Sequence, residues 1–138
     1  MTVKQFFDTN VLIYAFDSCE PAKQPTAIDR LGEAVRNQTG VISTQVLGEF
    51  LHSLVVRKQL LTATEAERAV NDFASGFEVS DVTLPMVQSA ITIHQRFQLR
   101  YWDSLIVATA NHCACAEIVS EDMNDGQDYN GSIVRNPF

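Results

Sequence analysis

Four acidic residues occupy positions from which they could do chemistry, and two of them stand at predicted helix starts. Asp8 ends a short apolar run at Phe7 and precedes Thr9 and Asn10, which are typical of a helix start. Asp103 begins an almost wholly apolar segment, where the positive end of a helix dipole favours a carboxylate. Either residue could be a helix cap or a ligand for a cation.

Glu49 and Asp122 also have structural explanations. Glu49 falls on the same helical face as Gln45 and His52, away from the apolar stripe, so a solvated glutamate would account for it. Asp122 lies between a predicted strand and an Asn-Asp-Gly turn at residues 124–126, and turn chemistry could account for it. Taken singly, none of the four acids establishes a function.

The elements that must position these acids alternate between strand and helix. The pattern predicts strands at residues 4–7, 41–42, 77–82, 117–120 and 132–134, and helices at residues 11–16, 27–35, 46–55, 64–73, 85–97 and 103–115. This alternation indicates one α/β domain over residues 1–138, with a mainly parallel central sheet and helices on both faces. In such sheets ligands bind beyond the carboxyl ends of the strands, where Asp8 and Asp122 fall.

The length and composition favour a globular cytoplasmic protein. The chain has 138 residues, of which 46% are hydrophobic and 20% charged, which fits one domain with a sizeable core. The sequence contains no apolar run long enough to span a bilayer, and its start lacks the features of a signal peptide. The three cysteines have no zinc-binding spacing and agree with a reducing compartment.

The net charge of −7, from 10 basic and 17 acidic residues, disfavours a nucleic-acid partner at first sight. Two divalent cations bound by the acids would add four positive charges and bring −7 to −3. They would also reverse the sign of the charge where a phosphate would sit. The total charge therefore leaves the partner open, and the placement of the acids decides it.

Short segments along the whole chain resemble the PIN domain, and in particular the VapC-like ribonuclease toxins of bacterial toxin–antitoxin pairs. The resemblance begins at residues 7–14 (FDTNVLIY) and continues at 43–49 (STQVLGE) and 101–106 (YWDSLI). It closes at residues 119–123 (VSEDM), 125–127 (DGQ) and 136–138 (NPF). Each segment is short, but their order, spacing and structural context together match the family.

This resemblance implies roles for particular residues. Four acids would form the acidic cluster of the family: Asp8, Glu49, Asp103 and Asp122. Asn10 and Ser120 would line the site and orient its ligands or water. Asp125 is a candidate outer-shell acid, although its place next to Gly126 in a turn explains it as well. The resemblance assigns no basic contact to substrate; Arg100 is the first candidate to test for that role, because it lies just before the YWDSLI segment.

Four carboxylates in one pocket would repel one another unless cations were bound between them. All-oxygen ligands suit Mg²⁺ or Mn²⁺ rather than zinc. The predicted reaction is hydrolysis of an RNA phosphodiester by a metal-activated water. The resemblance implies a 5′-phosphate and a 3′-hydroxyl as products, a small antitoxin as partner, and a homodimer.

Two rival functions remain to be weighed. A phosphatase or phospho-acceptor domain could use Asp8 as its nucleophile, but the haloacid-dehalogenase pattern needs a second Asp where this chain has Asn10. That fold and response-regulator receivers also need a late lysine, and the lysines here are Lys4, Lys23 and Lys58. The other rival is a catalytically silent PIN domain that binds RNA or protein, which a metal titration would distinguish from a nuclease.

Overall fold

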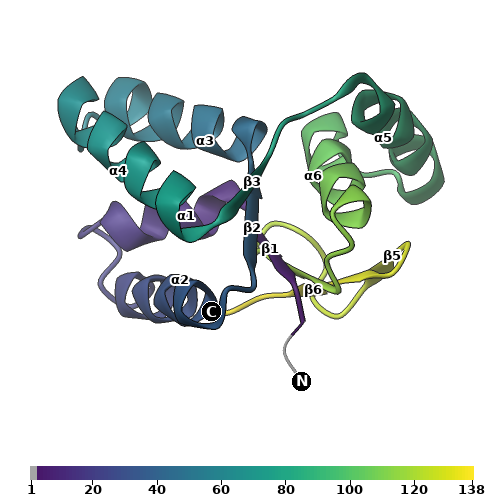
Figure 1. Ribbon diagram of the computed structural model, residues 1–138, viewed down its shortest axis with the longest axis horizontal. Helices are drawn as coiled ribbons and strands as arrows, with labels where there is room; N and C mark the ends of the chain where they lie inside the picture. The colour runs from purple at the N-terminus through teal and green to yellow at the C-terminus, as the bar shows by residue number, and fades with distance from the viewer. Residues whose placement is uncertain (1–2) are drawn as a thin grey trace.

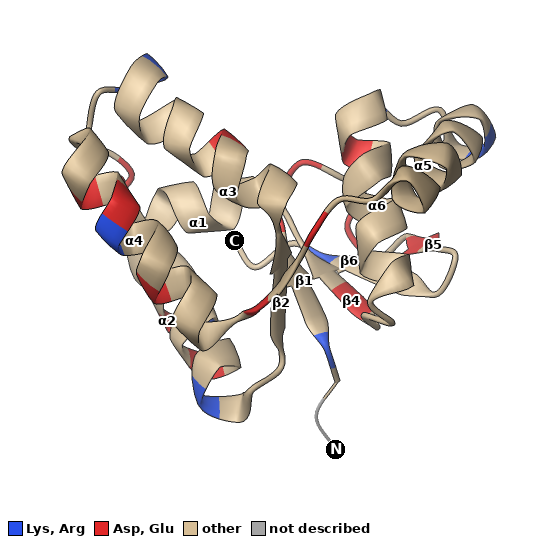
Figure 2. Ribbon diagram, turned by 45° about the horizontal axis from the view of Figure 1, so that its top comes forward, with Lys and Arg blue, Asp and Glu red and all other residues tan. Residues whose placement is uncertain are grey.

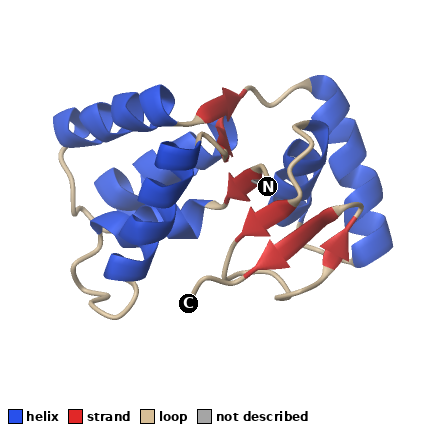
Figure 3. Ribbon diagram, turned by 60° about the horizontal axis from the view of Figure 1, so that its bottom comes forward, coloured by secondary structure: helices blue, strands red, loops and turns tan. Residues whose placement is uncertain are grey.

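A computed structural model describes residues 3–138 and shows a six-stranded sheet between two groups of helices (Figures 1 and 3). The strands are β1 (Gln5–Phe7), β2 (Gly40–Ser43), β3 (Glu78–Ser80), β4 (Glu117–Val119), β5 (Asp128–Tyr129) and β6 (Ser132–Arg135). Their order is β3-β2-β1-β4-β6-β5, and every pair is parallel except β5 with β6. The predicted α/β fold with a mainly parallel sheet is confirmed.

The helices cover both faces of this sheet, as predicted. They are α1 (Thr9–Phe16), α2 (Gln24–Asn37), α3 (Thr44–Leu51), the π-helical η1 (His52–Arg57), α4 (Ala63–Gly76), α5 (Leu84–Phe97) and α6 (Tyr101–His112). Figure 1 shows α1 to α4 on one side of the strands and α5 with α6 on the other. Within residues 3–138, no helix is long and apolar enough to cross a membrane.

Side-chain caps turn the chain from strand to helix with no intervening loop. The Asp8 carboxylate accepts the backbone N–H of Thr9 at 2.7 Å, so α1 begins directly after β1. Ser43 Oγ accepts the N–H of Val46 at 3.3 Å and starts α3 directly after β2 in the same way. These two turns place the first residues of α1 and α3 at the carboxyl edge of the sheet.

An aromatic cluster holds three of the helices against the sheet. The rings of Phe16, Phe50 and Phe73, from α1, α3 and α4, pack edge to face with centroids 5.4–6.1 Å apart. Phe73 contacts Phe77, which in turn contacts Phe7 of β1 at 5.7 Å. Such edge-to-face pairs stabilise beyond their buried area, and they fix α1 and α3 relative to β1.

On the other face, α6 is buried along most of its length, as its apolar sequence predicts. Every residue from Asp103 to Ala110 is buried. The helix begins at Tyr101 and ends at His112 rather than spanning 103–115, and Cys113 forms its C-cap. The first turn of α6 therefore contains the acid at position 103.

One strand is absent from the sequence prediction, and the helix predicted at residues 46–55 changes to a wider winding partway along. β5 is only two residues long and pairs antiparallel with β6, and a strand this short shows no periodicity. η1 continues α3 with a wider turn, in which the N–H of Lys58 bonds to the carbonyl of Ser53 at 2.8 Å. This turn ends at Lys58, whose ammonium group reaches the carboxylate of Asp17 at 2.8 Å.

Candidate active site

Asp8 is a buried carboxylate at the carboxyl end of β1, with only 5% of its surface exposed. Its Oδ1 accepts the N–H of Thr9 and its Oδ2 accepts the hydroxyl of Ser120, both at 2.7 Å. Burial raises the pKa of Asp8 from 3.8 to about 7; these two hydrogen bonds lower it, while the charges of Asp122 and Asp103 add to the rise. None of the ion pairs among residues 3–138 involves Asp8. A buried acid with a raised pKa and no cationic partner is typical of a functional site.

Asn10 joins Asp8 to two residues of the loop that follows β4. Its amide nitrogen lies 3.0 Å from Asp122 Oδ2 and 3.3 Å from both Asp8 Oδ2 and Ser120 Oγ. An amide group has two N–H donors, so it serves two of these three acceptors at once. The backbone N–H of Asp122 donates to Ser120 Oγ at 3.1 Å. Four of the predicted site residues thus belong to one network across neighbouring strands β1 and β4.

Asp103 reaches the same edge of the sheet from the first turn of α6. Its side chain is 11% exposed, and Arg100 donates to both of its oxygens, from Nε and Nη2, at 3.1 Å each. The pKa of Arg100 is raised first by this pairing with Asp103 and further by the charges of Asp122 and Asp8. The charge of Arg100 in turn lowers the pKa of Glu49, so Arg100 lies in the field of all four predicted acids.

Glu49 approaches from α3 on the opposite side. The Thr9 hydroxyl donates to Glu49 Oε1 at 3.0 Å. Burial raises the pKa of Glu49, hydrogen bonding including that from Thr9 lowers it, and the nearby charge of Asp103 raises it. Figure 2 shows acidic positions on both α3 and α6, on either side of the strands. The contact of Thr9 with Glu49 was not predicted, although Thr9 stands inside the FDTN segment.

Two other acids of this region are held by contacts of their own. Asp125 Oδ1 accepts the backbone N–H of Asn136 at 2.9 Å, which ties the turn to the end of the chain. The side chain of Glu121 pairs with Lys23 at 2.8 Å and accepts the hydroxyl of Tyr14. The role of Asp125 as an outer-shell acid stays a prediction.

The donor set has the chemistry of a hard divalent cation site, because every candidate ligand is a carboxylate oxygen. As placed, however, the side chains of residues 3–138 include no group of three or more His, Cys, Asp and Glu spaced to hold a metal ion. Each of the four acids is instead held by an internal donor. The pairs are Arg100 with Asp103, Asn10 with Asp8 and Asp122, and Thr9 with Glu49.

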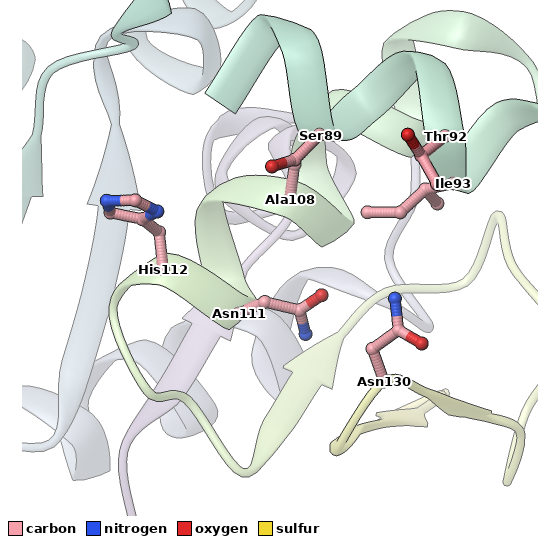
Figure 4. Close-up of a pocket in the computed structure, with 7 residues that line it drawn as sticks. All are labelled: Ser89, Thr92, Ile93, Ala108, Asn111, His112 and Asn130. Atoms are coloured by element: carbon pink, nitrogen blue, oxygen red, sulfur yellow. The ribbon is translucent and has the colours of Figure 1, made fainter. Parts of the chain in front are cut away.

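A separate polar cavity of about 350 Å³ lies at the other end of α6 (Figure 4). It is lined by Ser89, Thr92, Ile93, Ala108, Asn111, His112 and Asn130. Asn111 belongs to the last turn of α6, and its amide already donates to Tyr129 O at 3.0 Å and to Ser132 Oγ at 2.8 Å. The lining contains no carboxylate, so this cavity lacks the chemistry of the acidic site.

Comparisons with known proteins agree with this geometry. The chain matches the PIN domain family model over residues 6–124. It also resembles solved structures. One is a toxin–antitoxin complex from Klebsiella pneumoniae, with 20% sequence identity, a TM-score of 0.69 and 98% of each chain covered. Another is DNA-bound VapBC from Salmonella typhimurium, with 16% sequence identity, a TM-score of 0.73, and 99% of this chain and 100% of that chain covered. A third is the sarcin–ricin loop cleaving toxin VapC20 from Mycobacterium tuberculosis, with 20% sequence identity, a TM-score of 0.67, and 86% of this chain and 92% of that chain covered.

At these identities the solved structures establish a shared fold. No significant match was found among curated proteins. The family model spans most of the sequence, from the second residue of β1 through the loop that contains Asp122. The chain belongs to the PIN domain family.

Proposed function

We propose that this chain is a metal-dependent ribonuclease that hydrolyses phosphodiester bonds in RNA. The observation that carries the proposal is the environment of Asp8, which is buried, belongs to no ion pair among residues 3–138 and lies within the field of two further carboxylates. Such an arrangement costs free energy unless a cation compensates it. In a PIN domain whose candidate ligands are all oxygen atoms, Mg²⁺ or Mn²⁺ meets that need.

Asp8, Asp103, Asp122 and Glu49 would hold the cation. When bound, it would neutralise the charge of the acids and of the phosphate and lower the pKa of the attacking water. Ser120 and Asn10 orient Asp8 and Asp122 through the hydrogen bonds described above. Water adds to phosphorus, the bond from phosphorus to the 3′ oxygen breaks, and that oxygen takes a proton, which leaves a 5′-phosphate and a 3′-hydroxyl.

The proposed cellular role is that of the toxin in a toxin–antitoxin pair, acting in the cytoplasm as a homodimer. Three of the similar structures are described as toxin–antitoxin or VapBC complexes. This chain offers an apolar groove of about 290 Å³ between the end of α1, α2 and α4. Three exposed apolar side chains, Phe16, Ile28 and Val35, line it. An apolar segment of a small antitoxin would cover them and remove that surface from water.

Metal binding and RNA cleavage, measured on the same protein, test the nuclease proposal. We expect calorimetric titration to show Mn²⁺ binding and labelled RNA to be cleaved only when Mg²⁺ or Mn²⁺ is present. D103N should weaken Mn²⁺ binding and abolish cleavage, because it removes one carboxylate ligand. D29N is the matched control, since Asp29 is an exposed acid on α2 and should leave both measurements unchanged.

Two results would count against the proposal. Cleavage that persists in EDTA or in D103N would exclude this mechanism. Binding of RNA with neither Mn²⁺ binding nor cleavage would instead identify the chain as a catalytically silent PIN module.

A further inference from the structure

Arg100 is the cation that the structure places on one of the four acids of the site. Of the ion pairs within residues 3–138, the one between Arg100 and Asp103 alone includes any of those acids. The guanidinium donates one hydrogen bond to each oxygen of Asp103 and so occupies one lone pair on each. A metal ion on Asp103 would have to compete with these bonds and with the positive charge of Arg100.

The side chain of Arg100 is largely exposed, whereas its backbone is anchored. The backbone N–H and the hydroxyl of Ser104 both donate to the carbonyl of Arg100, at 2.9 and 3.0 Å, which holds the residue at the start of α6. The side chain is 73% exposed, so its departure from Asp103 opens no cavity and leaves only an ion pair near the surface to break. A divalent ion can displace it at small cost.

Once displaced, the guanidinium remains next to the acids that would hold the cation. The two parallel N–H donors of the guanidinium, which bind both oxygens of a carboxylate, can bind two oxygens of a phosphate in the same way. In a chain with a net charge of −7, a positive side chain at the site would add to the attraction that a bound cation exerts on the scissile phosphate of RNA.

We propose that Arg100 is a phosphate-binding residue that is held on Asp103 until a divalent cation takes that carboxylate. This role rests on the proposed nuclease function. It makes Arg100 an internal competitor of the metal before RNA binds and a contact to the RNA phosphate afterwards. Removal of the side chain should therefore strengthen metal binding and weaken RNA cleavage.

R100Q, R100K and the control R96Q test both halves of the proposal. Arg96, on α5, donates to Asn130 at 2.9 Å and stacks on Phe97, so R96Q removes one positive charge that belongs to no ion pair among residues 3–138. The measurements are the Mn²⁺ dissociation constant without RNA, from the electron paramagnetic resonance signal of free Mn²⁺, and kcat/KM for a fluorescent 12-nucleotide RNA at saturating Mn²⁺. Thermal unfolding checks that each variant is folded.

We expect R100Q to bind Mn²⁺ about two- to fivefold more tightly than wild type, the factor that corresponds to an exposed ion pair. Its cleavage efficiency should fall by about 100-fold, as when one donor to the reacting group is lost. R100K keeps the charge but loses the paired N–H donors of the guanidinium. Its Mn²⁺ dissociation constant and its kcat/KM should therefore lie between those of R100Q and wild type. R96Q should match wild type in both measurements.

A merely structural role for Arg100 would weaken metal binding and cleavage together, so that result would overturn the proposal. Mn²⁺ binding no tighter in R100Q than in R96Q would overturn the competition, and wild-type cleavage by R100Q would overturn the phosphate contact. If wild type binds no Mn²⁺ at all, the nuclease function fails first. The two failures are therefore distinguishable.

Discussion

Helix α1 has a buried aspartate at each end, and the two differ in their electrostatic partners. Asp8 caps the start of the helix and Asp17 its end, with 5% and 2% of their surfaces exposed. The Lys58 ammonium, 2.8 Å away, lowers the pKa of Asp17 against its burial. Asp8 has no ion-pair partner in the described chain, and burial raises its pKa to about 7.

The difference separates a structural carboxylate from one suited to bind a cation. The end of a helix carries partial negative charge, so a carboxylate there needs a cation from elsewhere. Lys58, the residue that follows η1, supplies it. The start of a helix favours a carboxylate, yet the cost of burying Asp8 exceeds that gain. Burial without an ion-pair partner among residues 3–138 is what makes Asp8 the centre of the proposed metal site.

The largest expected effect is a loss of catalysis, and it should follow from replacing Asp8 at the start of α1 but not from replacing Asp17 at its end. D8N should lower RNA cleavage by about 10³-fold or more, because the amide cannot neutralise a divalent ion. D17N removes an equally buried carboxylate and should retain wild-type kcat per folded molecule. Cleavage rates measured at 15 °C check this, with circular dichroism used first to establish that each variant is folded at that temperature. Equal losses of cleavage rate in D8N and D17N would contradict the distinction between a cation-binding Asp8 and a structural Asp17.

Metal-free protein should lose stability as the pH rises. The pKa of Asp8 is raised from 3.8 to about 7 in the folded state, so the folded chain holds a proton there that the unfolded chain has released. The contribution of this proton to the free energy of unfolding is fully present below about pH 4 and is lost as the pH rises toward 7. The free energy of unfolding in EDTA should therefore fall by about 2–3 kcal/mol between pH 5 and pH 7.5.

Urea unfolding at the two pH values measures this slope. Added MnCl₂ should restore stability at pH 7.5, and D8N should flatten the dependence in EDTA. A slope unchanged by D8N would assign the titration to another group.

At the other end of α1, K58M should destabilise the protein by about 1–2 kcal/mol at pH 7, less than a fully buried pair because Lys58 is one third exposed. The pKa of Asp17 is lowered, so its contribution is present above pH 3.8 and is lost as the pH falls below that value. The difference between K58M and wild type should thus shrink as the pH is lowered through this range, as urea unfolding would show. A difference that does not shrink would mean that packing, rather than charge, accounts for the loss.

The smallest effect is expected for D125N. The Asp125 carboxylate accepts the backbone N–H of Asn136, so it resembles Asp17 in having a partner of its own. An asparagine oxygen can accept the same bond. Cleavage should change by less than about threefold, within the factor that one neutral hydrogen bond contributes. A tenfold loss in kcat/KM would place Asp125 among the acids of the site.

The order of residues along the chain was sufficient to predict the fold class, whereas the resemblance to the PIN domain nominated the four acids. The alternation of apolar strands with helical segments predicted the mainly parallel sheet, and Asp8 after Phe7 placed a carboxylate at a strand end. These features are local, because strand ends and helix starts depend on neighbouring residues and their backbone hydrogen bonds. The boundaries of α6 and the two-residue β5 were missed, since helix ends fray and short strands carry little pattern.

Only the tertiary structure decided which carboxylate has a cation. Asp17 and Lys58 are 41 residues apart and meet because the turn of η1 brings them together. Asp8 and Ser120 are 112 residues apart and meet because β1 and β4 are neighbours in the sheet. A pKa depends on burial and on charges from the whole chain, which sequence spacing does not specify. The sequence therefore named the acids, and the packing of distant elements set their charges.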